Sequence, residues 1–242
     1  MKRAYFITAT GTDLGKTWLT AGVAAACHAR GVAVRAVKPV MSGYDAANPA
    51  ASDAGVLLQK LGTPGVLCTS FGRLPSGRAG VTASEVAAIA PWRFAAPLSP
   101  DLAAAREGRA IDFAELVGWC RGEMERNDGL LLIEGVGGVM VPLDARHTVR
   151  DWIAALGLPV VLVAGSYLGA LSHTLTALSA LREAGVVPCA IVVNESAGSS
   201  VGVEDTVASL VPHSGDIGLI IVKRDDAAGI ERLTDFLMES SE

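Results

Sequence analysis

The stretch Tyr5-Phe6-Ile7-Thr8-Ala9-Thr10-Gly11-Thr12-Asp13-Leu14-Gly15-Lys16-Thr17 decides the fold expected for this chain. It reads as a short apolar strand, a loop of small residues, and Gly-Lys-Thr at the start of a helix. A phosphate-binding loop requires that order, because consecutive backbone N–H groups and a helix N-terminus form a positively polarised concavity. In such a loop Lys16 would contact the outer phosphates of a nucleotide, and the Thr17 hydroxyl would bind Mg²⁺.

The glycine spacing of this loop departs from the usual pattern. With four residues before Gly-Lys-[Ser/Thr], the first glycine would fall at Thr10, and with five it would fall at Ala9. Gly11 is then the residue expected to supply the flexible turn. The alternative interpretation of the stretch is a chance turn between a strand and a helix.

Composition limits the classes of protein to consider. The 242 residues fit one large α/β domain over 1–242, or two small ones, and with 50% hydrophobic and 19% charged residues they can fill a core. The net charge of −5 gives no general attraction to nucleic acids or anionic membranes. A nucleotide would therefore be held by local charges such as Lys16 and Lys38.

The cysteines and the N-terminus indicate the compartment. Cys27, Cys68, Cys120 and Cys189 lie far apart without metal-ligand spacing, so we interpret them as reduced structural thiols. No signal peptide precedes the first strand, and no apolar run reaches the ~20 residues that span a bilayer. We expect a cytoplasmic protein.

Apolar runs and helix boundary signals alternate along the chain. After the first strand, strands are expected at 32–40, 130–134, 158–164, 189–193 and 217–222, with residues 63–80 irregular. Helices are expected at 18–30, 54–61, 112–126, 149–156, 169–184, 203–211 and 230–238, and further helices start at Thr82 and Ser99. The alternation predicts a single-domain, mostly parallel sheet with helices on both faces, of the P-loop NTPase-like kind.

Four separated segments should meet at one edge of that sheet. Right-handed crossovers place the carboxyl ends of parallel strands together, and ligands bind at that edge. Oxygen atoms for Mg²⁺ would come from Thr17, Asp53 and Glu134, and Lys38 would face the phosphates. The alternatives are a strand-end acid for Glu134, a first-turn acid for Asp53 and a solvated edge lysine for Lys38. The converging segments are residues 11–17, 38–42, 134–138 and 194.

These motifs resemble the dethiobiotin synthetase family. The loop, Val37-Lys38-Pro39-Val40-Met41-Ser42-Gly43 and Glu134-Gly135-Val136-Gly137-Gly138 carry the resemblance, which extends in order to about residue 195. It implies an ATP- and Mg²⁺-dependent cyclo-ligase that converts 7,8-diaminononanoate and CO₂ to dethiobiotin, with ADP and phosphate as products, through a carbamate phosphorylated by ATP. It also implies a homodimer with the substrate near the subunit interface.

The resemblance also implies roles for individual residues. Lys16 and Lys38 would be catalytic, Thr17, Asp53 and Glu134 would bind the metal, and Asn194 would contact the adenine edge. Contacts to diaminononanoate would come from Thr12, Asp13, Ser42 and Gly137. Contacts to the nucleotide would come from Asp13, Leu14, Gly15, Lys16, Thr17, Trp18, Asp53, Glu134, Gly135, Val136, Gly137 and Asn194. From the residues alone, Trp18 fits a core or interface position better than a stacking platform.

One departure and two rival classes complete the sequence evidence. The family's Pro-x-Leu-Gly-x-Ile-Pro-like turn, which helps hold the base, compares with residues 213–222, where no proline follows the isoleucine. Amidases of the cobyrinate group carry a glutaminase domain, for which 242 residues leave little room. Switch ATPases of the septum-site and partition kind carry a further lysine five residues before Lys16, where this chain has Gly11.

Overall fold

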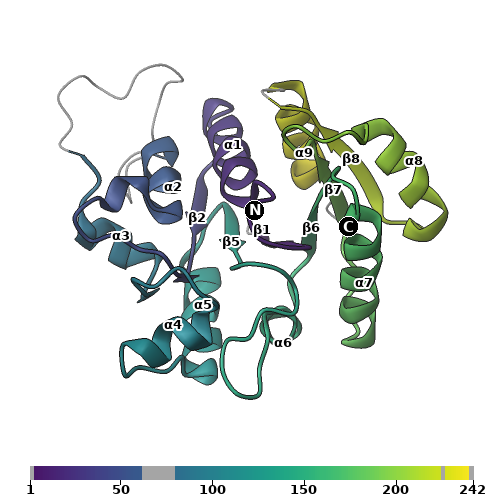
Figure 1. Cartoon of the computed structure of the whole chain (residues 1–242). Helices are drawn as coiled ribbons and strands as arrows, with labels where there is room; N and C mark the ends of the chain where they lie inside the picture. The colour runs from purple at the N-terminus through teal and green to yellow at the C-terminus, as the bar shows by residue number, and fades with distance from the viewer. Residues whose placement is uncertain (1–2, 62–79, 225–226, 240–242) are drawn as a thin grey trace.

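A parallel sheet forms the centre of the computed structural model, which describes residues 3–61, 80–224 and 227–239. Its strand order is β2-β5-β1-β6-β7-β8, and neighbouring strands pair in parallel (Figure 1). This confirms the predicted mostly parallel α/β architecture. The strands are β1 (Arg3–Ala9), β2 (Val34–Val37), β5 (Leu130–Glu134), β6 (Val160–Gly165), β7 (Ala190–Asn194) and β8 (Gly218–Val222).

Helices cover both faces of this sheet. In Figure 1, α1 (Lys16–Ala29) and α9 (Ala227–Glu239) lie above it, and α5 (Phe113–Arg126), α6 (Val149–Leu156) and α7 (Ala170–Glu183) lie below. Because the central strands are covered on both sides, they are continuous runs of Val, Leu and Ile that are almost completely buried. The remaining helices are α2 (Asp53–Leu61), α3 (Ala83–Ile89), α4 (Pro100–Arg106), α8 (Val203–Ser214) and a short 3₁₀ turn, Pro49–Ala51.

The helix boundaries follow the boundary signals in the sequence. Thr82 and Glu85 form the expected reciprocal capping box of α3, and the Asp112 carboxylate accepts from the Glu115 N–H at the start of α5. Gly157 ends α6 in the left-handed conformation that favours glycine. The predicted end of α8 near residue 211 was too early, since the helix continues to Ser214 with Pro212 in its last turn.

The predicted strand over residues 32–40 is wrong in its second half. The main-sheet strand β2 ends at Val37, and β3 (Val40–Met41) pairs instead with β4 (Trp92–Arg93) in a separate two-stranded sheet. Pro39 has no N–H for a ladder, and the Lys38 N–H donates to Ile89 O while the Trp92 N–H donates to Pro39 O. The chain therefore leaves the main sheet at Lys38.

The remaining expectations concern the cysteines, the irregular segment, membrane spans and the number of domains. Cys27, Cys120 and Cys189 are free thiols, and burial raises the pKa of Cys27 to about 11 and that of Cys120 to about 12. Cys68 and most of the irregular segment predicted at 63–80 lie outside the described residues. Among the helices that the structure describes, none has the length and apolar character needed to cross a bilayer. The single domain over 1–242 stays a prediction.

Candidate nucleotide site at the carboxyl edge of the sheet

The loop between β1 and α1 is shaped by two residues with left-handed backbone. Asp13 has φ 57°, and Gly15, directly before α1, has φ 86°. The positive φ favours glycine there, and a Cβ at this position would also lie 2.3 Å from Asn194 Nδ2 and displace that side chain. The same Asn194 Nδ2 donates to Leu14 O at 3.0 Å, which connects the loop to the carboxyl end of β7.

Lys16 connects this loop to the glycine-rich segment after β5. Its Nζ donates to Gly11 O at 2.9 Å and to Gly137 O at 2.8 Å. The two segments approach closely, since a Cβ on Gly138 would lie 3.1 Å from Thr10 O. Burial, together with the nearby Lys38 ammonium, lowers the pKa of Lys16 to about 8.

Lys38 is the centre of a buried charged network. Its side chain is 2% exposed, and Nζ lies 2.6 Å from Glu134 Oε1 and 2.9 Å from Asp53 Oδ2. Nζ also donates to Gly135 O at 2.9 Å. The Thr17 hydroxyl donates to the same Glu134 Oε1 at 2.7 Å. Glu134 is itself completely buried, so the carboxyl end of β5 holds a charge away from solvent.

The charges of this network stabilise one another. Burial alone would lower the pKa of Lys38, but the Glu134 and Asp53 carboxylates outweigh it and hold that pKa above its ordinary value. Burial would likewise raise the pKa of Asp53, but the Lys38 ammonium outweighs it and keeps that pKa below its ordinary value. Lys38 is therefore an ammonium and Asp53 a carboxylate near neutral pH.

The oxygen atoms of this network fit a magnesium ion. Glu134 Oε2 is buried and has no hydrogen-bond partner among the described residues, although a buried carboxylate oxygen normally has one. A hydroxyl and two carboxylates, from Thr17, Asp53 and Glu134, are the hard oxygen ligands that Mg²⁺ prefers. No cluster of three or more His, Cys, Asp or Glu suited to a metal occurs in the described part of the chain.

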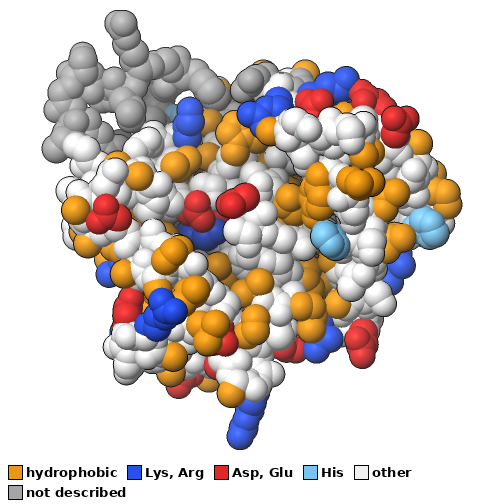
Figure 2. Space-filling view, in the orientation of Figure 1, with side chains coloured by type: hydrophobic (Ala, Val, Ile, Leu, Met, Phe, Trp, Pro, Cys, Tyr) orange, Lys and Arg blue, Asp and Glu red, His pale blue; other side chains and the backbone are white. Residues whose placement is uncertain are grey.

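The other predicted site residues are placed around this network. Thr12 and Asp13 are exposed in the loop, and Trp18 is 41% exposed in the first turn of α1. Ser42 is half-buried directly after β3, and the structure does not bring it into the hydrogen-bonded network. In the space-filling view of Figure 2, acidic and basic side chains lie side by side near the centre of the visible surface.

Several contributions to the site come from the backbone. Gly135 and Gly137 supply carbonyl acceptors to the two lysines, and Val136 between them packs against the core. The carbonyl of Gly11 was missed as a site group, because a backbone acceptor has no side-chain signature in the sequence. The pairing of β3 with β4, which carries the chain away after Lys38, was missed because a two-residue strand has no periodicity.

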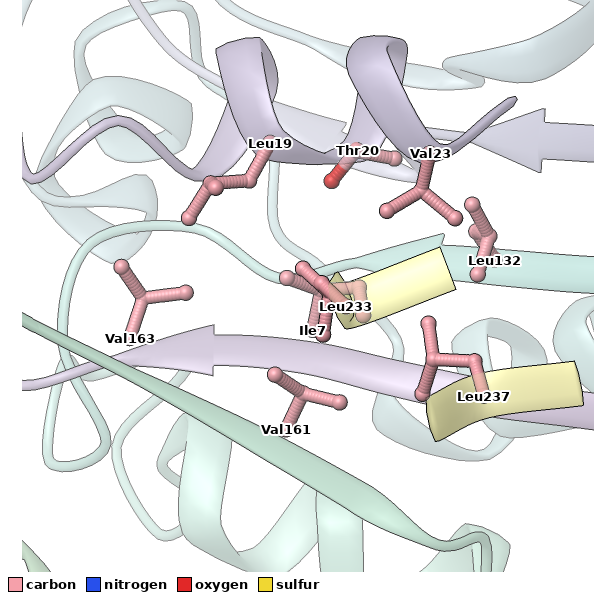
Figure 3. Close-up of a pocket in the computed structure, with 9 residues that line it drawn as sticks. All are labelled: Ile7, Leu19, Thr20, Val23, Leu132, Val161, Val163, Leu233 and Leu237. Atoms are coloured by element: carbon pink, nitrogen blue, oxygen red, sulfur yellow. The ribbon is translucent and has the colours of Figure 1, made fainter. Parts of the chain in front are cut away.

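A small apolar pocket lies away from these charges, between α1, α9 and the sheet (Figure 3). Its lining is hydrophobic except for Thr20, whose hydroxyl donates to Lys16 O within α1 at 2.8 Å. The pocket offers no free polar group to a ligand, so we interpret it as incomplete packing of the core. Its lining residues are Ile7, Leu19, Thr20, Val23, Leu132, Val161, Val163, Leu233 and Leu237.

Comparisons with solved structures agree with this fold. The Pyrococcus furiosus cell division ATPase MinD covers 100% of both chains with a TM-score of 0.57 and 17% identity. The match with Helicobacter pylori HypB covers 99% of this chain and 86% of the HypB chain, with a TM-score of 0.52 and 14% identity. At such identities the likeness concerns the fold alone. A family model described as an AAA domain matches residues 76–221.

The fold and the site together define a P-loop NTPase-like protein. Proteins named ATP-dependent dethiobiotin synthetase BioD match most of the chain, and the one from Acidiphilium cryptum is 50% identical over 211 residues, 87% of this chain and 88% of its own. The chain belongs to the dethiobiotin synthetase family, and it is an enzyme of the cyclo-ligase class. The relative from Methylobacterium nodulans is 45% identical, and the match covers 87% of this chain and 88% of the relative. The relative from Caulobacter sp. is 41% identical, and the match covers 97% of this chain and 94% of the relative.

Proposed function

We propose that the protein uses ATP and Mg²⁺ to carboxylate 7,8-diaminononanoate and close its ureido ring, with dethiobiotin, ADP and phosphate as products. The observation that carries this proposal is the contact of the buried Lys38 ammonium with Glu134 and Asp53, beside Lys16 and Thr17. A reaction that joins a carbamate to a phosphoryl group brings anions together, and fixed cations reduce their repulsion. Family membership supports the same reaction.

The loop and α1 would bind the triphosphate. The N–H groups from Asp13 to Trp18 form the cradle, and Lys16 would leave its two carbonyl acceptors to pair with the outer phosphates. Thr17, Asp53 and Glu134 would hold Mg²⁺, which when bound supplies positive charge on the phosphates. The remaining nucleotide contacts would be Leu14, Gly15, Gly135, Val136, Gly137 and Asn194, with Asn194 at the adenine edge.

Lys38 would act on the reacting groups. One substrate amine takes up CO₂ as a carbamate, and a carbamate oxygen then attacks the γ-phosphorus of ATP and releases ADP. The second amine attacks the carbamoyl carbon, the ureido ring closes, and phosphate leaves. In each step Lys38 would neutralise the negative charge of the carbamate or of the phosphoryl group, since its ammonium lies at the carboxyl end of β5.

Substrate contacts and assembly belong to the same proposal. Thr12, Asp13, Ser42 and Gly137 would contact diaminononanoate, which would lie near the interface of a homodimer. We further propose one domain over residues 1–242, a cytoplasmic location, and no partner of the nucleic-acid or membrane kind. The net charge of −5 supports the last point.

Product analysis tests this function directly. Purified protein would be incubated with ATP, Mg²⁺, bicarbonate and diaminononanoate, and the mixture analysed by mass spectrometry for dethiobiotin and ADP. Omission of each component in turn is the control. Absence of dethiobiotin from the complete mixture would refute the proposal. A thermal-shift panel of nucleotides, with and without diaminononanoate, then establishes the preferred base, since specific ligands raise apparent stability by mass action.

A further inference from the structure

The Lys38 ammonium occupies the position between the two carboxylates of the proposed metal site. Its Nζ is 2.6 Å from Glu134 Oε1 and 2.9 Å from Asp53 Oδ2. Asp53 starts α2 and Glu134 ends β5, so the lysine joins two elements that otherwise meet as like charges. In this arrangement one cation already satisfies the carboxylates that a metal ion would need.

We propose that Lys38 is an internal cation that holds the carboxylates of Asp53 and Glu134 together and is exchanged for the metal ion when nucleotide binds. The inference rests on the proposed magnesium site. It goes beyond the role of Lys38 toward the carbamate, because it makes the lysine a determinant of metal affinity before any substrate is present.

Thr17 and Lys38 both donate to Glu134 Oε1, but they differ in whether a metal ion could bind beside them. The Thr17 hydroxyl can donate its proton to this oxygen and still offer an oxygen lone pair to a metal, so that bond is compatible with metal binding. The Lys38 ammonium has no lone pair and carries a like charge, so its contact with the same oxygen competes with the metal. Exchange therefore requires movement of Lys38 but not of Thr17.

The second lysine is held differently. Lys16 Nζ donates to the carbonyls of Gly11 and Gly137, which are neutral acceptors. Lys38 has one neutral acceptor, Gly135 O at 2.9 Å, which can keep its Nζ at the site after it leaves the carboxylates. Of these two lysines, Lys38 is therefore the one whose ammonium competes with the metal for the same two carboxylates.

The charges of the site favour joint binding of metal and nucleotide. Apart from the exposed Asp13 carboxylate, which also acts on Lys16, the two lysines and the carboxylates of Asp53 and Glu134 sum to zero. A divalent cation alone therefore adds two positive charges to a balanced network that is buried except at Asp53. A nucleotide alone adds anionic phosphates beside the buried Glu134 carboxylate. When both bind, the carboxylates exchange one cation for another and Lys38 gains an anionic partner. Each ligand should then raise the affinity for the other, as linkage requires.

Metal binding without nucleotide tests the exchange. Mn²⁺, followed by electron paramagnetic resonance, would be titrated into the wild type, Lys38→Gln, Lys38→Met and Lys60→Gln. Lys60 is an exposed lysine of the same helix as Asp53 and serves as the matched control. We expect both Lys38 variants to bind Mn²⁺ on the order of 10-fold more tightly than the wild type, a size typical of coupled sites, and the control to be unchanged.

A second titration measures the coupling itself. With a non-hydrolysable ATP analogue present, the wild-type affinity for Mn²⁺ should increase, and the increase should be smaller for Lys38→Gln. Circular dichroism verifies folding, and Lys38→Gln keeps an amide donor for Glu134 if Lys38→Met fails to fold. Wild-type-like or weaker Mn²⁺ binding by the Lys38 variants would overturn the exchange. Absence of Mn²⁺ binding by the wild type even with the analogue would overturn the magnesium site itself.

Discussion

The carboxyl end of β5 and the middle of the same sheet are equally buried but chemically opposite. Glu134 pairs in register with Ile7 of β1, and both residues are almost completely enclosed. On the α1 side of the sheet, Ile7 lines the apolar pocket with Leu132 and Leu237 (Figure 3). Two residues beyond Leu132 on β5, Glu134 instead meets Lys38 and Thr17. Apolar packing at Ile7 and an ionic network at Glu134 thus lie side by side on paired strands.

This contrast separates what stabilises the fold from what performs its chemistry. Apolar side chains gain free energy when they leave water, about 25 cal/mol for each Å² of surface. Buried ion pairs lose much of their Coulomb attraction to desolvation, so an apolar replacement of similar volume is often as stable or more stable. The apolar layer should therefore govern stability, and the charged network should govern activity at some cost in stability.

The largest effect is expected when the network is made apolar. In the double variant Lys38→Met/Glu134→Leu, dethiobiotin formation should be lost, while the free energy of unfolding should stay the same or rise by ~1–4 kcal/mol. The residual carboxylate, Asp53, is partly exposed and can be hydrated. Urea unfolding followed by circular dichroism, alongside the product assay, measures both quantities. If the double variant were several kcal/mol less stable than the wild type, the charged network would contribute to stability, contrary to this prediction.

Removal of the lysine alone should act mainly on turnover. In Lys38→Ala the kcat should fall by on the order of 10²-fold or more, because the transferring phosphoryl group loses a fixed cation. Because Glu134 then stays buried without its cation, the free energy of unfolding should also fall, by ~3–5 kcal/mol, with the protein still folded at the assay temperature. Steady-state kinetics of this variant and of the control Lys60→Ala test the expectation. Near-normal turnover in Lys38→Ala would make Lys38 a structural residue only.

A truncation in the apolar layer should have the reverse effect. Leu237→Ala removes a completely buried side chain that lines the pocket, and the free energy of unfolding should fall by ~2–5 kcal/mol. The kcat of the folded protein should stay close to that of the wild type. Val211→Ala, at a position 55% exposed on α8, should change stability by less than about 0.5 kcal/mol. Equal stability losses in Leu237→Ala and Val211→Ala would contradict the prediction that the buried apolar layer governs stability.

Among the substitutions in the charged network and the apolar layer, the smallest effect is expected at the polar member of the pocket lining. The Thr20 hydroxyl donates to Lys16 O within its own helix at 2.8 Å, with no other partner among the described residues, and Thr20 is 1% exposed. In Thr20→Val one intrahelical hydrogen bond is lost and a methyl group faces apolar neighbours, so the free energy of unfolding should change by less than ~1.5 kcal/mol. Thermal unfolding measures the change. A larger loss would mean that this hydroxyl supports the start of α1.

The sequence predicted the elements of this fold well where the signals are local. The capping box at Thr82, the Asp112 cap and the glycine after α6 mark helix ends through short-range hydrogen bonds and backbone preference. The strand over 32–40 was predicted too long, because the β-branched run continues past Pro39 while the hydrogen-bond partners change. Such a change of partners depends on residues 89–93, which are distant in sequence.

The sequence by itself determined the parallel α/β class, the loop before Lys16, and the convergence of Lys38, Glu134 and Asn194 at one edge of the sheet. These follow from periodicity and from the handedness of crossovers, which are properties of short segments. Only the tertiary structure decided that Lys38 pairs with both proposed metal carboxylates, and that Asn194 is fixed against Leu14 O. Those pairings depend on ångström-scale distances between elements up to 180 residues apart, which packing alone sets.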